Sequence, residues 1–301
     1  LKVLCEAVFI SKAGILSVEL FVHECPLYLP RQDRERTMYK DRAPLIRLAT
    51  YNVRCPVDKE PNDWAHRLPR LLALMEKHRF GIVGLQEATK GQIEDLCGDG
   101  WAYVGRARED GLEKGEYSCI IYRPERFEVD ETGTFWLSET PDVAGSRSWE
   151  SVCTRICTWG RFRDRQTDSC FTHFNTHLDH RSKAAQLNGM KLILDQIKTI
   201  APEGAVILSG DFNVFPDSPV IALVDAIMHN VWDISLTPVE GPHYTFNAFT
   251  YRDEPTPTHP QPIDYIYVNS SVRVQGVRVL NDSDHGLYPS DHFPVMACLN
   301  I

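Results

Sequence analysis

The chain has 301 residues, 43% of them hydrophobic, and a formal net charge of −9. This size and composition support one large α/β domain whose core needs no disulfides. The acidic balance argues against broad, sequence-independent binding to nucleic acid, which normally requires a basic face. It leaves a nucleotide substrate open, because a bound cation and a few local Arg or Lys residues can reverse the field inside a cleft.

The first 44 residues are expected to be a leader and linker outside the main domain. Residues 1–30 are moderately apolar, but charged residues such as Glu6 and Lys12 interrupt them. They therefore lack the length of a membrane span and the unbroken apolar region of a secretory signal. Residues 31–43 are charged and poor in core residues, which is typical of a linker. We place the domain at residues 45–301.

The cysteines indicate a reducing compartment. Most of the nine lie in apolar, strand-like runs, where a free thiol behaves as a small buried hydrophobe. Cys153 and Cys157 are four residues apart but have no second pair or flanking histidine to complete a zinc site. We therefore expect a cytoplasmic protein with no transmembrane segment.

From residue 45 onward, short apolar runs alternate with helical patterns. The runs predict strands at residues 46–53, 80–87, 101–107, 117–123, 127–137, 155–162, 170–178, 205–213, 263–268, 272–280 and 293–299. The helical periodicity predicts helices at residues 68–78, 184–197 and 219–227. Pro69 fits the first of these helices only in its first turn. Strands followed by strands, with helices interspersed, predict two packed sheets with helices outside.

Polar side chains gather at the ends of two predicted strands. In the strand at 205–213, Asp211 and Asn213 share a face with the buried Ile207 and come last on it. In the strand at 170–178, Asn175 and His177 come last on their face in the same way. We therefore expect both strand ends to meet at the rim of a cleft, where ligands of open sheets usually bind.

A divalent cation is expected at this rim. Glu87 ends the apolar run 80–86, and Asn52 ends the first strand of the domain. A carboxylate beside a buried run must be compensated, and a cation does so at least cost. Hard oxygen ligands without a cysteine cluster favour Mg²⁺, with Mn²⁺ as the alternative, over zinc.

Each motif by itself also fits a structural role. Residues 210–213 fit an ordinary turn, residues 290–292 a helix cap, and Asp264 a buried acid satisfied by backbone donors. Their joint occurrence in this order favours a functional site. Other candidates are weaker: His180 is expected to cap or solvate the next helix, and His243, His259 and His285 are expected to be exposed in loops. Trp149 and Arg155 fit either contact with substrate or packing.

Six motifs, running from residue 45 to the C-terminus, resemble the endonuclease/exonuclease/phosphatase superfamily. They are Thr50-Tyr51-Asn52, Leu85-Gln86-Glu87, Asn175-Thr176-His177, Gly210-Asp211-Phe212-Asn213, Ile263-Asp264-Tyr265 and Ser290-Asp291-His292. Residues 115–123 and 263–268 are most similar to the nocturnin-like exonuclease branch and its uncharacterised microbial relatives. The resemblance implies a DNase-like, four-layered α/β sandwich, in which two packed mixed β-sheets are flanked by helices.

The resemblance also implies a metal site. Glu87 is similar to the family's main metal ligand, and Asn52 and Asp291 are similar to the residues that complete or support it.

The catalytic roles implied by the resemblance fall on five residues. Asp211 would orient or deprotonate the attacking water, and Asn213 would hold water and phosphate. His292 would bind the scissile phosphate with Asp264 aligning it, and His177 would contact the phosphate or assist the leaving oxygen.

We therefore expect a monomeric Mg²⁺-dependent phosphodiesterase or nuclease that uses in-line attack by water. Among such activities, the preferred prediction is a 3′–5′ exonuclease acting on RNA or nucleotides. The alternative is a phosphomonoesterase or a sphingomyelinase-like lipid phosphodiesterase with the same site. A binding module with a decayed site is disfavoured, because every expected catalytic position holds the right residue type.

Overall fold

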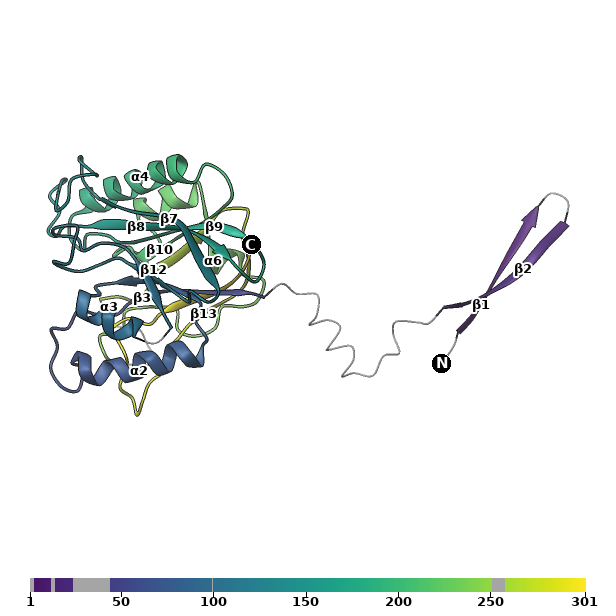
Figure 1. Cartoon of the computed structure of the whole chain (residues 1–301), viewed down its shortest axis with the longest axis horizontal. Helices are drawn as coiled ribbons and strands as arrows, with labels where there is room; N and C mark the ends of the chain where they lie inside the picture. Colours follow the sequence, from purple (N-terminus) through teal and green to yellow (C-terminus); the bar gives the residue numbers. More distant parts are fainter. Residues whose placement is uncertain (1–2, 12–13, 24–43, 99, 251–257) are drawn as a thin grey trace. The chain divides into compact units, whose positions relative to one another are not determined.

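The computed structural model describes residues 3–11, 14–23, 44–98, 100–250 and 258–301. The chain divides into two compact units, Leu1–Ala43 and Pro44–Ile301. In the first unit, β1 (Val3–Ser11) and β2 (Gly14–His23) form an antiparallel pair that the sequence did not predict (Figure 1). The predicted linker at residues 31–43 lies outside the described residues. No helix in the described part of the chain is long and apolar enough to span a membrane.

Two six-stranded mixed sheets make up the second unit. The first sheet has the order β13-β14-β3-β4-β6-β5 and the second the order β11-β12-β10-β9-β8-β7. Their strands are β3 (Ile46–Asn52), β4 (Ile82–Gln86), β5 (Ala102–Val104), β6 (Ile120–Tyr122), β7 (Phe127–Trp136), β8 (Ile156–Asp164), β9 (Cys170–His177), β10 (Ala205–Asp211), β11 (His229–Asn230), β12 (Asp264–Val268), β13 (Arg273–Val279) and β14 (Val295–Asn300).

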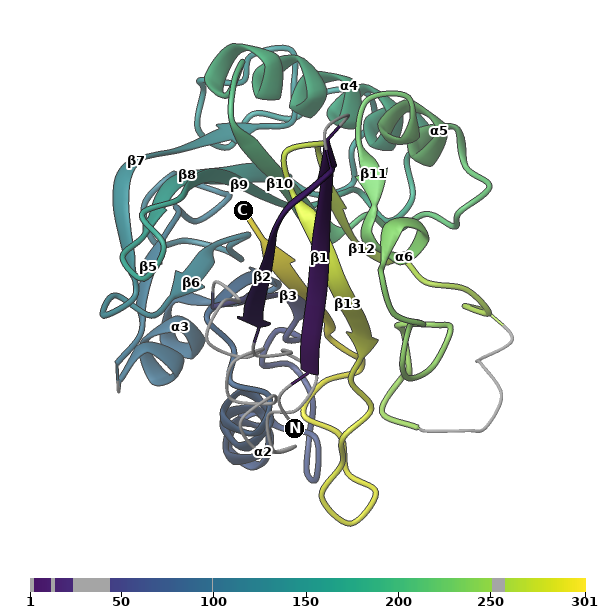
Figure 2. The same ribbon diagram turned by 90° about the vertical axis from the view of Figure 1, so that its right-hand side faces the viewer.

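Helices cover the outer faces of both sheets. α2 (Trp64–Lys77) and α3 (Lys90–Cys97) lie against the first sheet, and α4 (Lys183–Ile200) and α5 (Pro219–Asp225) against the second (Figures 1 and 2). A short helix, α6 (Val231–Ile234), follows β11. One apolar cluster lies between the sheets and one lies under each pair of helices. The predicted four-layered α/β sandwich is confirmed.

The start of α2 differs from the sequence prediction. The helix begins at Trp64, because the carboxylate of Asp63 caps it by accepting from the backbone N–H of His66 at 3.3 Å. Pro69 therefore lies in the second turn rather than the first. Pro69 has no backbone N–H, so the carbonyl of Ala65 loses its hydrogen bond within the helix. Both residues are exposed, so water can bind this carbonyl instead.

The strand register brings distant residues to one edge. Asp211, at the end of β10, lies opposite His177 on the parallel strand β9 and opposite Asp264 on the antiparallel strand β12. In the other sheet, Asn52 at the end of β3 lies opposite Gln86 at the end of β4. The polar residues Asp211, His177 and Asp264 therefore lie side by side at one edge of the second sheet, and Asn52 lies at an edge of the first.

Candidate active site

His292 and Asp264 form a buried hydrogen-bonded pair. His292 Nδ1 lies 2.9 Å from an oxygen of Asp264, and its Nε2 lies 3.9 Å from Asp211. The hydroxyl of Thr245 accepts the backbone N–H groups of Ile263 and Asp264, which fixes the start of β12. Burial by itself lowers the pKa of His292, but Asp264, Asp211 and Asp291 outweigh it and raise this pKa to about 10. The ring is therefore a cation at neutral pH.

Asp211 lies at the centre of the cluster. Its carboxylate accepts a hydrogen bond from Asn52 Nδ2 at 3.0 Å and lies 3.5 Å from His177 Nε2. Burial, together with the charge of Asp264, raises the pKa of Asp211 to about 7. A carboxyl group with such a pKa accepts a proton near neutral pH more readily than an ordinary aspartate does.

Asn52 connects Asp211 to Glu87. The same Asn52 Nδ2 donates to Glu87 Oε1 at 3.1 Å, and the backbone N–H of Cys55 donates to Glu87 Oε2 at 3.1 Å. Glu87 has a left-handed φ of 62°, a conformation that costs free energy in a residue other than glycine. Burial favours the neutral form of Glu87, but the Asn52 hydrogen bond and the charge of His292 outweigh it and lower the pKa.

Arg54 joins the Glu87 side of the cluster to Asp291. Its guanidinium lies 3.9 Å from a Glu87 oxygen and 3.8 Å from an Asp291 oxygen. Burial raises the pKa of Asp291. Sequence reasoning missed Arg54, although its place two residues after Asn52 was an available signal.

His177 and Asn213 form the opposite side of the cluster. Asn213 Nδ2 lies 2.9 Å from His177 Nε2 and donates to the carbonyl of Leu178 at 3.1 Å. Burial, followed by the positive charge of Arg155, holds the pKa of His177 well below its usual range. The ring is therefore neutral, and its Nδ1 has no partner among the described residues.

Two residues of the recognised motifs connect the sheets and do not face the cluster. Asn175 Oδ1 accepts from Gln86 Nε2 at 2.8 Å and from the hydroxyl of Ser209 at 3.2 Å. The Asn175 amide nitrogen donates to the carbonyls of Leu85 and Cys119 across the interface between the sheets. All of these groups are buried, so this network fixes how the two sheets pack.

Other polar residues outside the cluster have structural or exposed positions. Asp179 is buried, and its carboxylate accepts the backbone N–H groups of residues 152, 153, 181 and 182, which holds a loop against the start of α4. His243 and His285 are exposed, as predicted. His259 is half-buried, contrary to the prediction, because its ring packs 4.5 Å from Phe246, which in turn contacts His292.

The chemistry of the donor set fits a divalent cation. Glu87, Asp211, Asp264 and Asp291 place four carboxylates in the cluster, and the positive groups that contact them are Arg54 and His292. One amide nitrogen, that of Asn52, serves two of these carboxylates. Oxygen donors with excess negative charge suit Mg²⁺ or Mn²⁺.

Within the cluster, Asp211, Asp264 and His292 have ligand atoms that all lie within 4.8 Å of one another. His292 is protonated, however, and its Nδ1 already binds Asp264. A histidine can bind a metal only through a neutral imidazole. These three residues therefore fit a charged histidine between two acids better than a metal cage.

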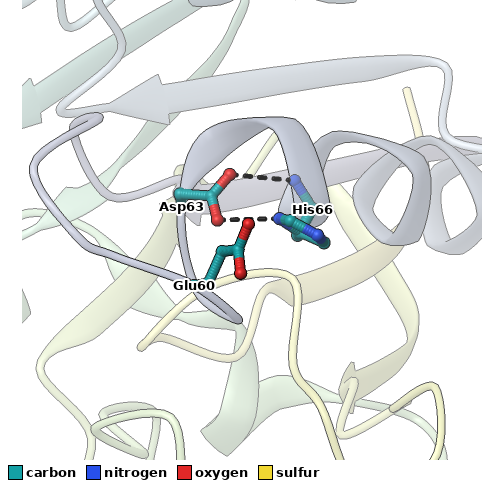
Figure 3. A group of neighbouring side chains, drawn as sticks. All are labelled: Glu60, Asp63 and His66. Carbon is teal, nitrogen blue, oxygen red and sulfur yellow. Dashed lines mark hydrogen bonds and ion pairs between the residues drawn. The ribbon is translucent and has the colours of Figure 1, made fainter.

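Glu60, Asp63 and His66 form a second group with metal-ligand spacing in the described part of the chain (Figure 3). Asp63 Oδ2 lies 2.7 Å from His66 Nδ1, and Asp63 is also the N-cap of α2. Glu60 and His66 are exposed. The capping of α2 accounts for this arrangement.

Comparison with known proteins places these residues in a family context. Residues 49–292 match the sequence model of the Endonuclease/Exonuclease/phosphatase family. A structure from Bacteroides vulgatus, described as an endonuclease/exonuclease/phosphatase, is 33% identical, with a TM-score of 0.79 over 85% of this chain and 99% of that one. A mannosyl-6-phosphatase from Bacteroides thetaiotaomicron is 32% identical, with a TM-score of 0.77 over 85% of this chain and 100% of that one.

More distant relatives agree with this placement. The catalytic domain of human nocturnin is 17% identical, with a TM-score of 0.68 over 86% of this chain and 94% of that one, a likeness of fold alone. An uncharacterized protein of Acanthamoeba polyphaga mimivirus is 27% identical over 183 residues, or 56% of this chain. The chain spans about 65% of the length of that viral protein.

Proposed function

Because the chain belongs to the Endonuclease/Exonuclease/phosphatase family, we propose that it hydrolyses phosphate esters with the help of a divalent cation, Mg²⁺ before Mn²⁺. The observation that carries the proposal is the buried cluster in which Asn52 joins Asp211 to Glu87 while His292 stands between Asp211 and Asp264. It combines an oxygen donor set, a proton acceptor and a fixed cation, which this hydrolysis needs.

Asn52, Glu87 and Asp291 would hold the cation. When bound there, it would polarise a phosphoryl oxygen and offset the negative charge that develops in the transition state. The left-handed backbone of Glu87 and its hydrogen bonds from Asn52 and Cys55 support this role, because they fix the carboxylate before any ion binds.

Asp211 and His292 would act on the water and on the phosphate. Asp211, whose pKa burial raises to about 7, orients the attacking water and accepts its proton. His292 Nε2 donates a hydrogen bond to a phosphoryl oxygen, while Asp264 holds Nδ1 and thereby fixes the ring. A charge fixed in place before the reaction stabilises the phosphoryl transition state without reorganisation.

His177 and Asn213 would bind the phosphate from the other side. His177 is neutral, so it serves as a hydrogen-bond donor through Nδ1 and not as a strong acid. Asn213 is held by the carbonyl of Leu178 and by its own backbone N–H, which donates to Asp211 at 3.0 Å.

For the substrate, a phosphomonoester of a small polyol such as a sugar comes first. A cleft of about 470 Å³ adjoins the Glu87 side of the site and includes Cys55, whose N–H binds Glu87. Lys90 and Arg108 line this cleft together with three glutamates, Glu109, Glu113 and Glu116. This mixed charge suits a substrate rich in hydroxyls better than a polyanion. The 32% identity to a mannosyl-6-phosphatase over its whole length points the same way.

The phosphodiesterase activity expected from the sequence, on the 3′ ends of RNA or on nucleotides, is the second candidate. The similarity of residues 115–123 and 263–268 to the nocturnin-like branch is what favours it. No observation separately supports a lipid phosphodiesterase activity, so sphingomyelin is included only as a test substrate.

The test is a panel of phosphate esters with Mg²⁺ or with a chelator. Mannose 6-phosphate, glucose 6-phosphate, oligo(A), bis(p-nitrophenyl) phosphate and sphingomyelin would separate the substrate classes by their products. We expect sugar phosphates to turn over fastest with Mg²⁺. Glu87→Ala and Asp211→Asn should each reduce kcat by about 10²–10⁴-fold with thermal unfolding nearly unchanged. Turnover that a chelator or Glu87→Ala leaves intact would refute the metal mechanism.

A further inference from the structure

Arg155 is a buried cation whose guanidinium makes a single, long hydrogen-bond contact within the described part of the chain. The residue is 6% exposed, and neither Nε nor Nη1 of its guanidinium has a partner among the residues that the structure describes. Nη2 lies 3.4 Å from Nδ1 of His180, a weak contact. A guanidinium carries five N–H donors, and a buried charge without partners is unfavourable for folding. The proposed roles of the other site residues leave this side chain unexplained.

The nearby charges do not neutralise Arg155. Glu116 attracts it and Arg108 repels it. Glu116, however, already binds Arg108, whose Nη1 lies 2.5 Å from its carboxylate. Two guanidinium groups therefore share one carboxylate, so Glu116 does not neutralise Arg155.

Arg155 belongs to the same edge of the sheet as the catalytic cluster. It directly precedes β8, which pairs with β9, and the hydroxyl of Thr176 donates to the carbonyl of Ile156 at 2.9 Å. The next residue along β9 is His177. The positive charge of Arg155 lowers the pKa of His177, and the negative charge of Asp211 favours the charged form of Arg155. The three side chains are therefore electrostatic neighbours. The carbonyl of Arg155 accepts from the backbone N–H of Leu137 at 2.8 Å, which anchors its main chain.

We propose that Arg155 binds non-bridging oxygens of the substrate phosphate beside His177, through an edge of its guanidinium that Nη2, with its one weak contact, forms together with Nε or Nη1. This inference deepens the proposed function and rests on it. A guanidinium edge matches two phosphate oxygens, whereas an ammonium group does not. His177 Nδ1, which is also buried and has no partner in the described part of the chain, would complete the pocket. Arg155 would thus supply positive charge to the phosphate whether or not the metal is bound.

The test measures binding of inorganic phosphate by calorimetry with divalent ions chelated, so that it does not depend on turnover. Arg155→Met keeps the length and removes the charge, and Arg155→Lys keeps the charge and removes the planar edge. Arg163→Met is the matched control, because Arg163 lies on β8 with 47% of its side chain exposed and pairs with Asp168. We expect about a tenfold or greater loss of phosphate affinity in Arg155→Met, a smaller loss in Arg155→Lys and none in Arg163→Met.

Thermal unfolding separates this role from a structural one. Since Arg155→Met removes a buried charge without partners, it should unfold at the wild-type temperature or above. Wild-type phosphate affinity in Arg155→Met, or in Arg155→Lys if the Met variant does not fold, would overturn the inference. So would a wild-type protein that binds no phosphate. The proposed function fails differently, through absence of ester hydrolysis by the wild-type protein with Mg²⁺.

Discussion

At the scale of single residues, the site depends on opposite protonation states in two buried histidines. His292 contacts Asp264 and Asp211, and its pKa is raised to about 10 against the effect of burial. His177 is also buried, but Arg155 adds to the effect of burial and lowers its pKa. One ring is therefore a fixed cation and the other a neutral donor, which suits a phosphate held between them.

Asp264→Asn tests this assignment. The amide can still hydrogen-bond to His292 but no longer stabilises its charge, so the pKa of His292 should fall from about 10 toward the ordinary value near 6.5. NMR titration of the ring in metal-free protein measures it directly. In the wild-type protein, the charged His292–Asp264 pair makes its full contribution to the free energy of unfolding below about pH 6.5. This contribution is lost as the pH rises through about 10, the raised pKa of His292. An unchanged titration in Asp264→Asn would show that Asp264 does not control this charge.

At the scale of elements, the sequence predicted most strands and the polar residues that end several of them, because apolar periodicity and strand-end polar residues are local signals. The helix α3 was missed, since only Ile93 and Leu96 mark an apolar face in a polar segment. Its cap, in which the Thr89 N–H donates to Gln92 Oε1 at 3.1 Å, was the overlooked signal.

Other features could not be predicted from sequence because they depend on packing. The register that sets Asp211 opposite both His177 and Asp264 comes from sheet pairing between distant segments. The same holds for Asn175, which the motif suggested as part of the site. The packing of the two sheets turns it inward, onto Gln86 and Ser209. The isolated guanidinium of Arg155 is likewise visible only once its neighbours are placed.

Gly84→Ala tests how tightly the sheets meet at this network. A Cβ at Gly84 would lie 2.5 Å from Asn175 Oδ1 and 2.6 Å from the hydroxyl of Ser209, both of which are buried and hydrogen-bonded. We expect the variant to lose about 1–3 kcal/mol of unfolding free energy in denaturant titrations. Gly91→Ala is the matched control: nothing lies within 4 Å of its Cβ, and it should gain up to about 1 kcal/mol within α3. Equal effects of the two substitutions would contradict this packing.

At the scale of the whole molecule, the second unit holds every residue assigned to the site, from Asn52 to His292. The family match, residues 49–292, also lies entirely within it. Its two sheets and their three apolar clusters form a complete four-layered core. On these grounds we propose that residues 1–43 are a separate leader and linker and that the catalytic domain begins at Pro44, one residue before the predicted boundary.

Truncation tests this division. Residues 44–301 should fold cooperatively, with a midpoint of urea unfolding and a kcat for phosphate ester hydrolysis close to those of the full chain. Residue 44 is retained because the guanidinium of Arg126 donates to the carbonyls of Pro44 and Leu45 at 3.1 Å and 3.0 Å and pairs with the buried Asp164 at 2.7 Å, which holds the start of the domain. Arg126→Met in the truncated chain should therefore lower stability by about 1–3 kcal/mol, because it leaves the Asp164 charge buried and unpaired. A truncated chain that unfolds early while keeping Arg126 would show instead that residues 1–43 contribute to the stability of the catalytic domain.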